Sequence, residues 1–93
     1  MIKNLLHATV LAALLSFLPV AAQAADQRFC QDYARAALNQ VRGGLANPRC
    51  VGGMQGNRWS SDFRVHYDWC VSQPYAAVGG ERDARTAFLR ACR

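Results

Sequence analysis

Hydrophobic residues between Asp26 and Arg42 recur with the spacing of an amphipathic helix. They lie three and four positions apart, at Phe29, Cys30, Tyr33, Ala34, Ala37, Leu38 and Val41. Asp26 is a suitable N-cap residue, and the pair Gly43-Gly44 after Arg42 is a typical stop signal. The pattern therefore predicts a first helix over residues 26–42.

Aromatic residues are concentrated in a second helical segment, over residues 61–72. We expect Ser60 or Ser61 to cap its N-terminus, with Asp62 in the first turn and Pro74 preventing its continuation. Its hydrophobic positions form two faces, one with Phe63, His66, Tyr67 and Cys70 and the other with Val65 and Trp69. Because both faces need a cover, we expect this helix to lie between the other two.

A third helix is predicted over residues 81–92, after a turn over residues 72–80. Its hydrophobic positions are Ala84, Ala87, Phe88, Ala91 and Cys92, and its outer side carries Arg82, Arg85 and Arg90. Residues 43–58 contain five of the seven glycines and no hydrophobic period, which is typical of a loop, and Cys50 can anchor it. We therefore predict an all-α fold: a small three-helix, disulfide-stapled array with a long Gly-rich first loop.

The N-terminal segment has the three parts of a secretory signal peptide. Lys3 supplies the positive charge, residues 5–18 are apolar, and Ala22-Gln23-Ala24 is a typical cleavage site. The apolar run is shorter than the roughly 20 residues that a membrane-spanning helix needs. We expect a signal peptide over residues 1–24, cleaved after Ala24 or Ala25, and a single domain over residues 25–93. The mature protein would be periplasmic or secreted and have no transmembrane anchor.

The domain contains all four cysteines of the chain, an even number that predicts two disulfides in an exported protein. The order of the helices selects the pairing. In an antiparallel hairpin Cys30, near the start of the first helix, meets Cys70, near the end of the second. The last turn of the third helix then brings Cys92 to the loop that carries Cys50. We predict the bridges Cys30–Cys70 and Cys50–Cys92.

The chain has a formal net charge of +5, and every cation after Lys3 is an arginine. Arginine favours bidentate contacts with carboxylates and phosphates, so an anionic component of the cell envelope is one candidate partner. The arginines are spread along the chain among acidic residues, which is also typical of a solvated surface. The sequence indicates no specific nucleic-acid binding, and a protein of the envelope is the other candidate partner.

Residue types that carry chemistry do not converge in this sequence. His66 and Cys70 lie one helical turn apart, but Cys70 has a disulfide partner and cannot serve as a thiolate nucleophile. Zinc ligands usually include closely spaced cysteine pairs, and the sequence has none. Asp62 and Asp68 lie on different faces of one helix, and Asp32 has Arg35 beside it. We expect no catalytic residue, metal or cofactor.

The aromatic residues of the segment 58–70 are interpreted as packing of a small core, although a stacking platform for sugars or bases is the alternative. Trp59 lies at the junction with the loop, beside Arg58, and is the aromatic residue that we most expect to be exposed. Arg58 and Trp59 are therefore the candidate binding surface. Whether Trp59 and His66 serve packing or binding is left open.

The order of residues along the mature chain resembles that of a group of small exported four-cysteine proteins of Gram-negative bacteria. The matching positions are Cys30, Tyr33-Ala34, Ala37, Gln40, Cys50, Arg58-Trp59, Asp62, His66-Tyr67, Trp69-Cys70 and Cys92. The resemblance covers nearly all of the mature chain and implies an exported, disulfide-bonded helical protein. It implies no activity, cofactor or site residue.

These observations favour a non-enzymatic protein of the cell envelope that serves as a binding or structural module. One alternative is a small inhibitor of a secreted enzyme, with residues 43–58 as its contact surface. Another is a metal-binding or redox protein that uses reduced cysteines.

Overall fold

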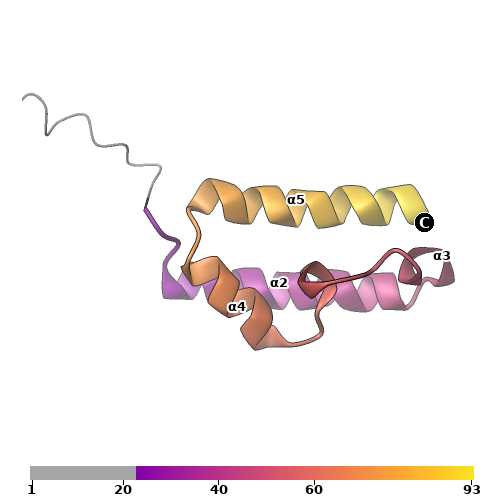
Figure 1. Cartoon of the computed structure of the whole chain (residues 1–93), viewed down its shortest axis with the longest axis horizontal. Coiled ribbons are helices and arrows are strands. Elements are labelled where there is room, and N and C mark those ends of the chain that lie inside the picture. The colour runs from indigo at the N-terminus through magenta and orange to yellow at the C-terminus, as the bar shows by residue number, and fades with distance from the viewer. Residues whose placement is uncertain (1–22) are drawn as a thin grey trace, which may run out of the picture.

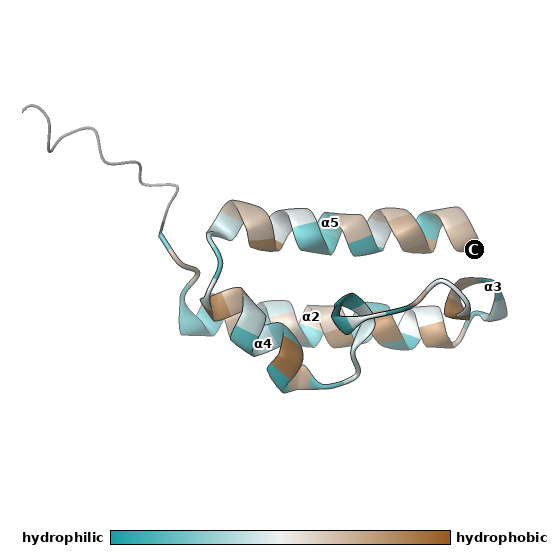
Figure 2. Ribbon diagram, viewed as in Figure 1, coloured by the Kyte–Doolittle hydropathy of each residue, from teal (hydrophilic) through white to brown (hydrophobic). Residues whose placement is uncertain are grey.

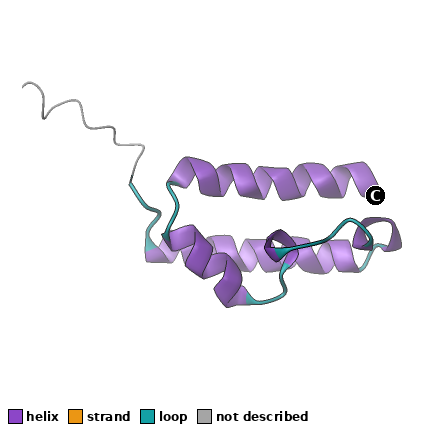
Figure 3. Ribbon diagram, viewed as in Figure 1, coloured by secondary structure: helices purple, strands orange, loops and turns teal. Residues whose placement is uncertain are grey.

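Helices make up most of the part of the chain that the computed structural model describes, residues 23–93. Their order is α2 (Gln27–Leu45), α3 (Pro48–Val51), the 3-10 helix η2 (Asn57–Trp59), α4 (Phe63–Val71) and α5 (Tyr75–Cys92). Within the described residues there is no strand, only an isolated bridge between Ala24 and Pro74 (Figure 3). The predicted all-α array is therefore confirmed.

Helix α2 is the element around which the others are arranged. It contacts α3, α4 and α5, and α5 runs alongside it while α4 lies against its first half (Figure 1). The expectation that the segment 61–72 lies between the other two helices is wrong. Hydrophobic and hydrophilic residues alternate along α2 and α5, as in helices with one buried side (Figure 2). The buried side of α2 carries Cys30, Tyr33, Ala34, Ala37, Val41 and Gly44.

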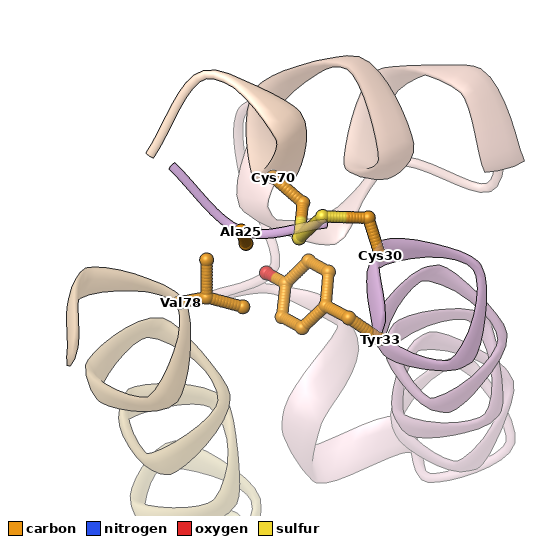
Figure 4. Packing of buried hydrophobic residues seen from close by; sticks show 5 residues of the cluster. All are labelled: Ala25, Cys30, Tyr33, Cys70 and Val78. Carbon is orange, nitrogen blue, oxygen red and sulfur yellow. A yellow bond between two sulfur atoms is a disulfide. The ribbon is translucent and has the colours of Figure 1, made fainter. Parts of the chain in front are cut away.

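Both predicted disulfides are confirmed, Cys30–Cys70 and Cys50–Cys92. The first belongs to the hydrophobic core, where the ring of Tyr33 lies between the disulfide and Val78 of α5 (Figure 4). It joins α2 to α4. The second joins α3 to the last turn of α5. Because the hydrophobic core of so small a domain supplies little stability, each bridge adds to the stability of the contact between two helices.

Two glycine pairs lie inside helices, although the sequence pattern predicts both outside them. Helix α2 continues through Gly43-Gly44 to Leu45, and α5 begins at Tyr75 and includes Gly79-Gly80. At Gly44 the reason is packing, because an added Cβ would lie 2.6 Å from Met54 Sδ and 3.0 Å from Leu89 Cδ2. The absence of a side chain lets the residues 52–56 and α5 approach α2 closely.

The substitution Gly44→Val is therefore expected to destabilise the protein. Met54 can yield in part, but the branched side chain would also meet Leu89, which predicts a loss of about 1–3 kcal/mol in the free energy of unfolding. Gly43→Val is the matched control, since a Cβ at Gly43 meets nothing within 4 Å. Urea unfolding of both variants checks this, and equal losses at the two positions would contradict it.

The predicted long loop contains short helical segments. Asn47 caps α3 by accepting a hydrogen bond from the Arg49 amide at 2.9 Å, and η2 follows a glycine, Gly56, with a φ of 85°. This conformation favours glycine because other side chains are strained there. Single-turn segments leave no hydrophobic period in a sequence, which explains why they were not predicted.

The start of α4 also differs from the expectation. Asp62 is the N-cap, and its carboxylate accepts a hydrogen bond from the Arg64 amide at 2.9 Å. Ser60 does not cap the helix itself. Its hydroxyl accepts a hydrogen bond from the amide of the N-cap residue Asp62 at 3.0 Å. The helix therefore begins at Phe63 rather than at Ser61.

The first described residues are attached to the turn between α4 and α5. Ala25 is buried, and its amide donates to the Gln73 carbonyl at 2.8 Å. Of the two cleavage positions that we predict, the one after Ala24 retains this contact. The predicted signal peptide lies almost wholly in residues 1–22, outside the described residues. None of the helices in residues 23–93 has the length and hydrophobicity that crossing a membrane requires.

Asp26 caps α2 and also contacts α5. Its carboxylate accepts from the Phe29 amide at 2.8 Å and from the Tyr75 hydroxyl at 2.7 Å. Both hydrogen bonds lower the pKa of Asp26 below its ordinary value of 3.8, and the bond from the Phe29 amide has the larger effect.

A lowered pKa in the folded protein means that the ionised carboxylate of Asp26 stabilises the fold at neutral pH. This contribution is complete above pH 3.8 and is lost as the pH falls through the lower, folded-state pKa. We expect Asp26→Asn to lower the urea midpoint at about pH 7 and to have a smaller effect near pH 3. Asp32→Asn, at an exposed position on the same helix, is the control. A difference between Asp26→Asn and the wild type that is independent of pH would contradict the assignment.

Candidate functional site

A pocket of about 200 Å³ opens where η2, α4 and α5 meet the side of α2. Its lining comes from all four of these elements: Tyr33, Asn57, Arg58, Val65, His66, Trp69, Glu81 and Arg85. Its position depends on the first disulfide, because Cys30–Cys70 holds α4 against α2. The pocket combines charged side chains with an apolar wall, which is typical of small-molecule sites.

Arg85 is the most unusual residue of the pocket, because its charged side chain is only 1 % exposed. Its Nε donates to Gln40 Oε1 at 2.7 Å, and its Nη2 donates to the Tyr33 hydroxyl at 2.9 Å. The third nitrogen, Nη1, is buried and has no hydrogen-bond partner among the described residues. Buried polar groups are nearly always paired, so this nitrogen needs an explanation.

The hydrogen-bond partners of Arg85 carry no negative charge. Gln40 is neutral, and burial raises the pKa of Tyr33 above its ordinary value of 10.0, although the hydrogen bond from Arg85 opposes this effect. The Tyr33 hydroxyl is therefore protonated at neutral pH. A buried guanidinium group without a bound carboxylate is unfavourable, because its desolvation is repaid only in part by neutral acceptors.

Arg58 and Glu81 form an ion pair that also lines the pocket. Arg58 Nε lies 2.5 Å from Glu81 Oε1, and Arg58 Nη2 lies 3.2 Å from Oε2. The hydrogen bonds and charge of Glu81 raise the pKa of Arg58 above its ordinary value. Because Glu81 is engaged by Arg58, the charge of Arg85 is left in excess in the pocket.

The remaining wall of the pocket is aromatic and apolar. The ring of Trp69 lies 5.9 Å from that of Tyr33, and Val65 is half-buried beside them. His66 is 3 % exposed, and its Nε2 lies 2.7 Å from the Ser60 carbonyl oxygen. A carbonyl only accepts, so Nε2 carries the proton and donates it there. This bond fixes the imidazole ring and ties α4 to the segment before it.

The two residues of the predicted binding surface face different surroundings. Arg58 lines the pocket, whereas Trp59 is buried, 8 % exposed, with its ring centroid 4.9 Å from that of Phe88. The expectation that Trp59 is the most exposed aromatic residue is therefore wrong. Trp59 reaches Phe88 because α5 lies opposite η2, which a pattern within one helix does not reveal.

The hydrophobic pattern of the sequence predicts Arg85 on the outer side of its helix, and this prediction is wrong. Arg85 is instead buried on the same face of α5 as Val78, seven residues earlier, whereas Ala87 and Ala91 are exposed. The error arose because the start of α5 was interpreted as a turn. A helix that includes residues 75–80 places Val78 and Arg85 two turns apart, and this spacing is the signal that was available.

The described part of the chain contains neither a candidate metal site nor a free thiol. Residues 23–93 contain no group of three or more His, Cys, Asp or Glu side chains that could hold a metal ion. All four cysteines are in disulfides, so the alternative of a protein with reduced cysteines has no thiol to use there.

Comparison of the chain with protein-family models, with curated proteins and with solved structures found no match in any of the three.

Proposed function

We propose that this chain is an exported, non-enzymatic binding protein of the cell envelope, and that the pocket beside Arg85 holds its ligand. The observation that carries the proposal is the unpartnered Nη1 of a buried arginine in the lining of a cavity. Buried donors that serve only the structure are nearly always satisfied within the protein, whereas binding sites keep groups that the ligand satisfies.

Export is supported by the disulfides and by the N-terminal sequence. Two disulfides indicate an oxidising compartment, since thiols in the cytosol of most bacteria are kept reduced. The predicted signal peptide over residues 1–24 supplies the route, and the structure of Ala25 and Asp26 is compatible with a mature chain that begins at Ala25.

The lining of the pocket supports binding rather than catalysis. It contains no Ser, Thr, Cys or Lys that could act as a nucleophile. The three groups of the lining that could transfer a proton are engaged in fixed contacts: His66 through Nε2 with a carbonyl, Glu81 with Arg58, and Tyr33 with Arg85. A general acid–base role needs a group within reach of substrate and free to exchange its proton.

Export is tested by expressing the full chain in a Gram-negative host and fractionating the cells. We expect the protein in the periplasm or medium, with an intact mass that corresponds to residues 25–93 carrying two disulfides. The variant Lys3→Glu/Leu11→Asp, which impairs the predicted signal peptide, is expected to leave the chain unprocessed in the cytoplasm. Cytoplasmic, unprocessed wild-type protein would contradict the proposal.

A further inference from the structure

We propose that the pocket binds a small organic monocarboxylate with one ring-sized apolar group, whose carboxylate pairs with Arg85. This inference rests on the proposed function, in which the pocket is a binding site, and adds the chemical class of the ligand. Three features of the pocket carry it: its charge, the donors of Arg85, and the size and character of its wall.

The charge of the pocket selects an anion with a single charge. Arg58 and Glu81 neutralise each other through two contacts, which leaves one positive charge, that of Arg85. A monoanion compensates this charge, whereas a cation would be repelled and a neutral ligand would leave the guanidinium group without a counterion. A dianion would bring a second charge close to Glu81.

The donors of Arg85 favour a carboxylate among the monoanions. Nη1 has no acceptor, and guanidinium groups pair with the two oxygens of a carboxylate in a planar fork. Nη1 is covered by its neighbours, so the carboxylate reaches it only if side chains of the lining move aside. Arg58, another lining residue, has a side chain that is 46 % exposed, so the pocket borders on solvent there.

The wall and the volume of the pocket define the rest of the ligand. Trp69 and Val65 offer an apolar surface, which an inorganic anion would not use. The volume is about 200 Å³. A cavity of roughly 150 Å³ is enough for benzene, so one ring with a carboxylate fits whereas a nucleotide does not.

The test is a titration of the purified, disulfide-bonded protein with sodium benzoate at constant ionic strength. Binding is followed by tryptophan fluorescence and by amide chemical shifts, because Trp69 lines the pocket. We expect saturable binding with a Kd below about 5 mM, and at least tenfold weaker binding of the neutral benzamide and the cationic benzylamine. N-acetylphenylalanine also has a carboxylate and one ring, but it carries the amide group of a peptide C-terminus, and we expect it to bind at least tenfold more weakly than benzoate.

Three variants connect binding to the pocket. Arg85→Met is expected to weaken benzoate binding at least about tenfold. Arg82→Met removes the same charge from an exposed position on the same helix and is expected to leave it unchanged. Val65→Trp fills the pocket without altering Arg85, and we expect it to abolish binding even if Arg85→Met does not fold.

The inference is overturned if benzoate does not bind, if benzamide binds equally well, if a folded Arg85→Met retains the wild-type affinity, or if Val65→Trp retains binding. Stronger binding of N-acetylphenylalanine than of benzoate would indicate a peptide C-terminus and overturn a simple ring carboxylate as the ligand. The proposed function has a test of its own, independent of the benzoate titration. It is contradicted by unprocessed cytoplasmic protein, and it survives a negative benzoate titration if the exported protein binds a neutral or macromolecular ligand that Val65→Trp excludes.

Discussion

Removal of the Cys30–Cys70 bridge by a double substitution with alanine is expected to unfold most of the protein at 25 °C. The bridge closes a loop with a sequence separation of 40 residues, which corresponds to about 4 kcal/mol in the chain-entropy model. Both half-cystines are fully buried in the core cluster with Tyr33 and Val78, so their truncation also leaves a cavity. A domain of this size has only about 3–5 kcal/mol of stability to lose.

The Cys50–Cys92 bridge is the internal control for this prediction. Its loop is of nearly the same length, with a separation of 42 residues, but Cys92 is only half-buried, and the bridge lies outside the core cluster. We therefore expect its removal to have the smaller effect. Urea unfolding followed by far-UV circular dichroism measures both, and a larger loss without Cys50–Cys92 would contradict this account of the core.

The disulfide pairing was predictable because it depends only on the order and direction of the helices. Cys30 lies near the start of one helix and Cys70 near the end of the next, and this relation holds even though the predicted helix bounds were several residues in error. The Asp26 cap was predictable for a similar reason, since it depends on a hydrogen bond within one turn.

Features that depend on contacts between helices were not predictable. Gly43-Gly44 has the composition of a stop, but α2 continues because Gly44 fits against Met54 and Leu89. The sequence also does not show that α5 begins before Gly79-Gly80, where the Tyr75 hydroxyl reaches Asp26. Intrinsic preferences are weak, and tertiary packing overrides them at both sites.

The pocket illustrates the same limit at the level of function. Arg85 is one of many arginines in the sequence, and its role becomes visible only when Tyr33 and Gln40 of α2 are placed opposite it. Local patterns assign arginine to the surface because it is rarely buried. The residues that contradict such a pattern are often those kept for binding rather than for stability.

Arg85→Met is therefore expected to affect binding far more than stability. The substitution removes two hydrogen bonds but also removes the cost of a buried charge that lacks a carboxylate partner. We expect a loss of no more than about 2 kcal/mol in the free energy of unfolding, whereas breaking a well-paired buried ion pair costs about 3–5 kcal/mol. Gln40 stays anchored in the variant, because its Nε2 also donates to Thr86 Oγ1 at 3.0 Å. Urea unfolding measures this, and a loss above this range would show that Arg85 chiefly holds the fold together.

The most direct test of the claim that Arg85 is kept for a carboxylate is the free energy of unfolding of the wild type and of Arg85→Met, each measured with and without sodium benzoate. At a benzoate concentration ten times the wild-type Kd, we predict a gain of about 1.4 kcal/mol for the wild type and of no more than about 0.4 kcal/mol for Arg85→Met. An equal gain for both proteins, or no gain for the wild type, would contradict the claim.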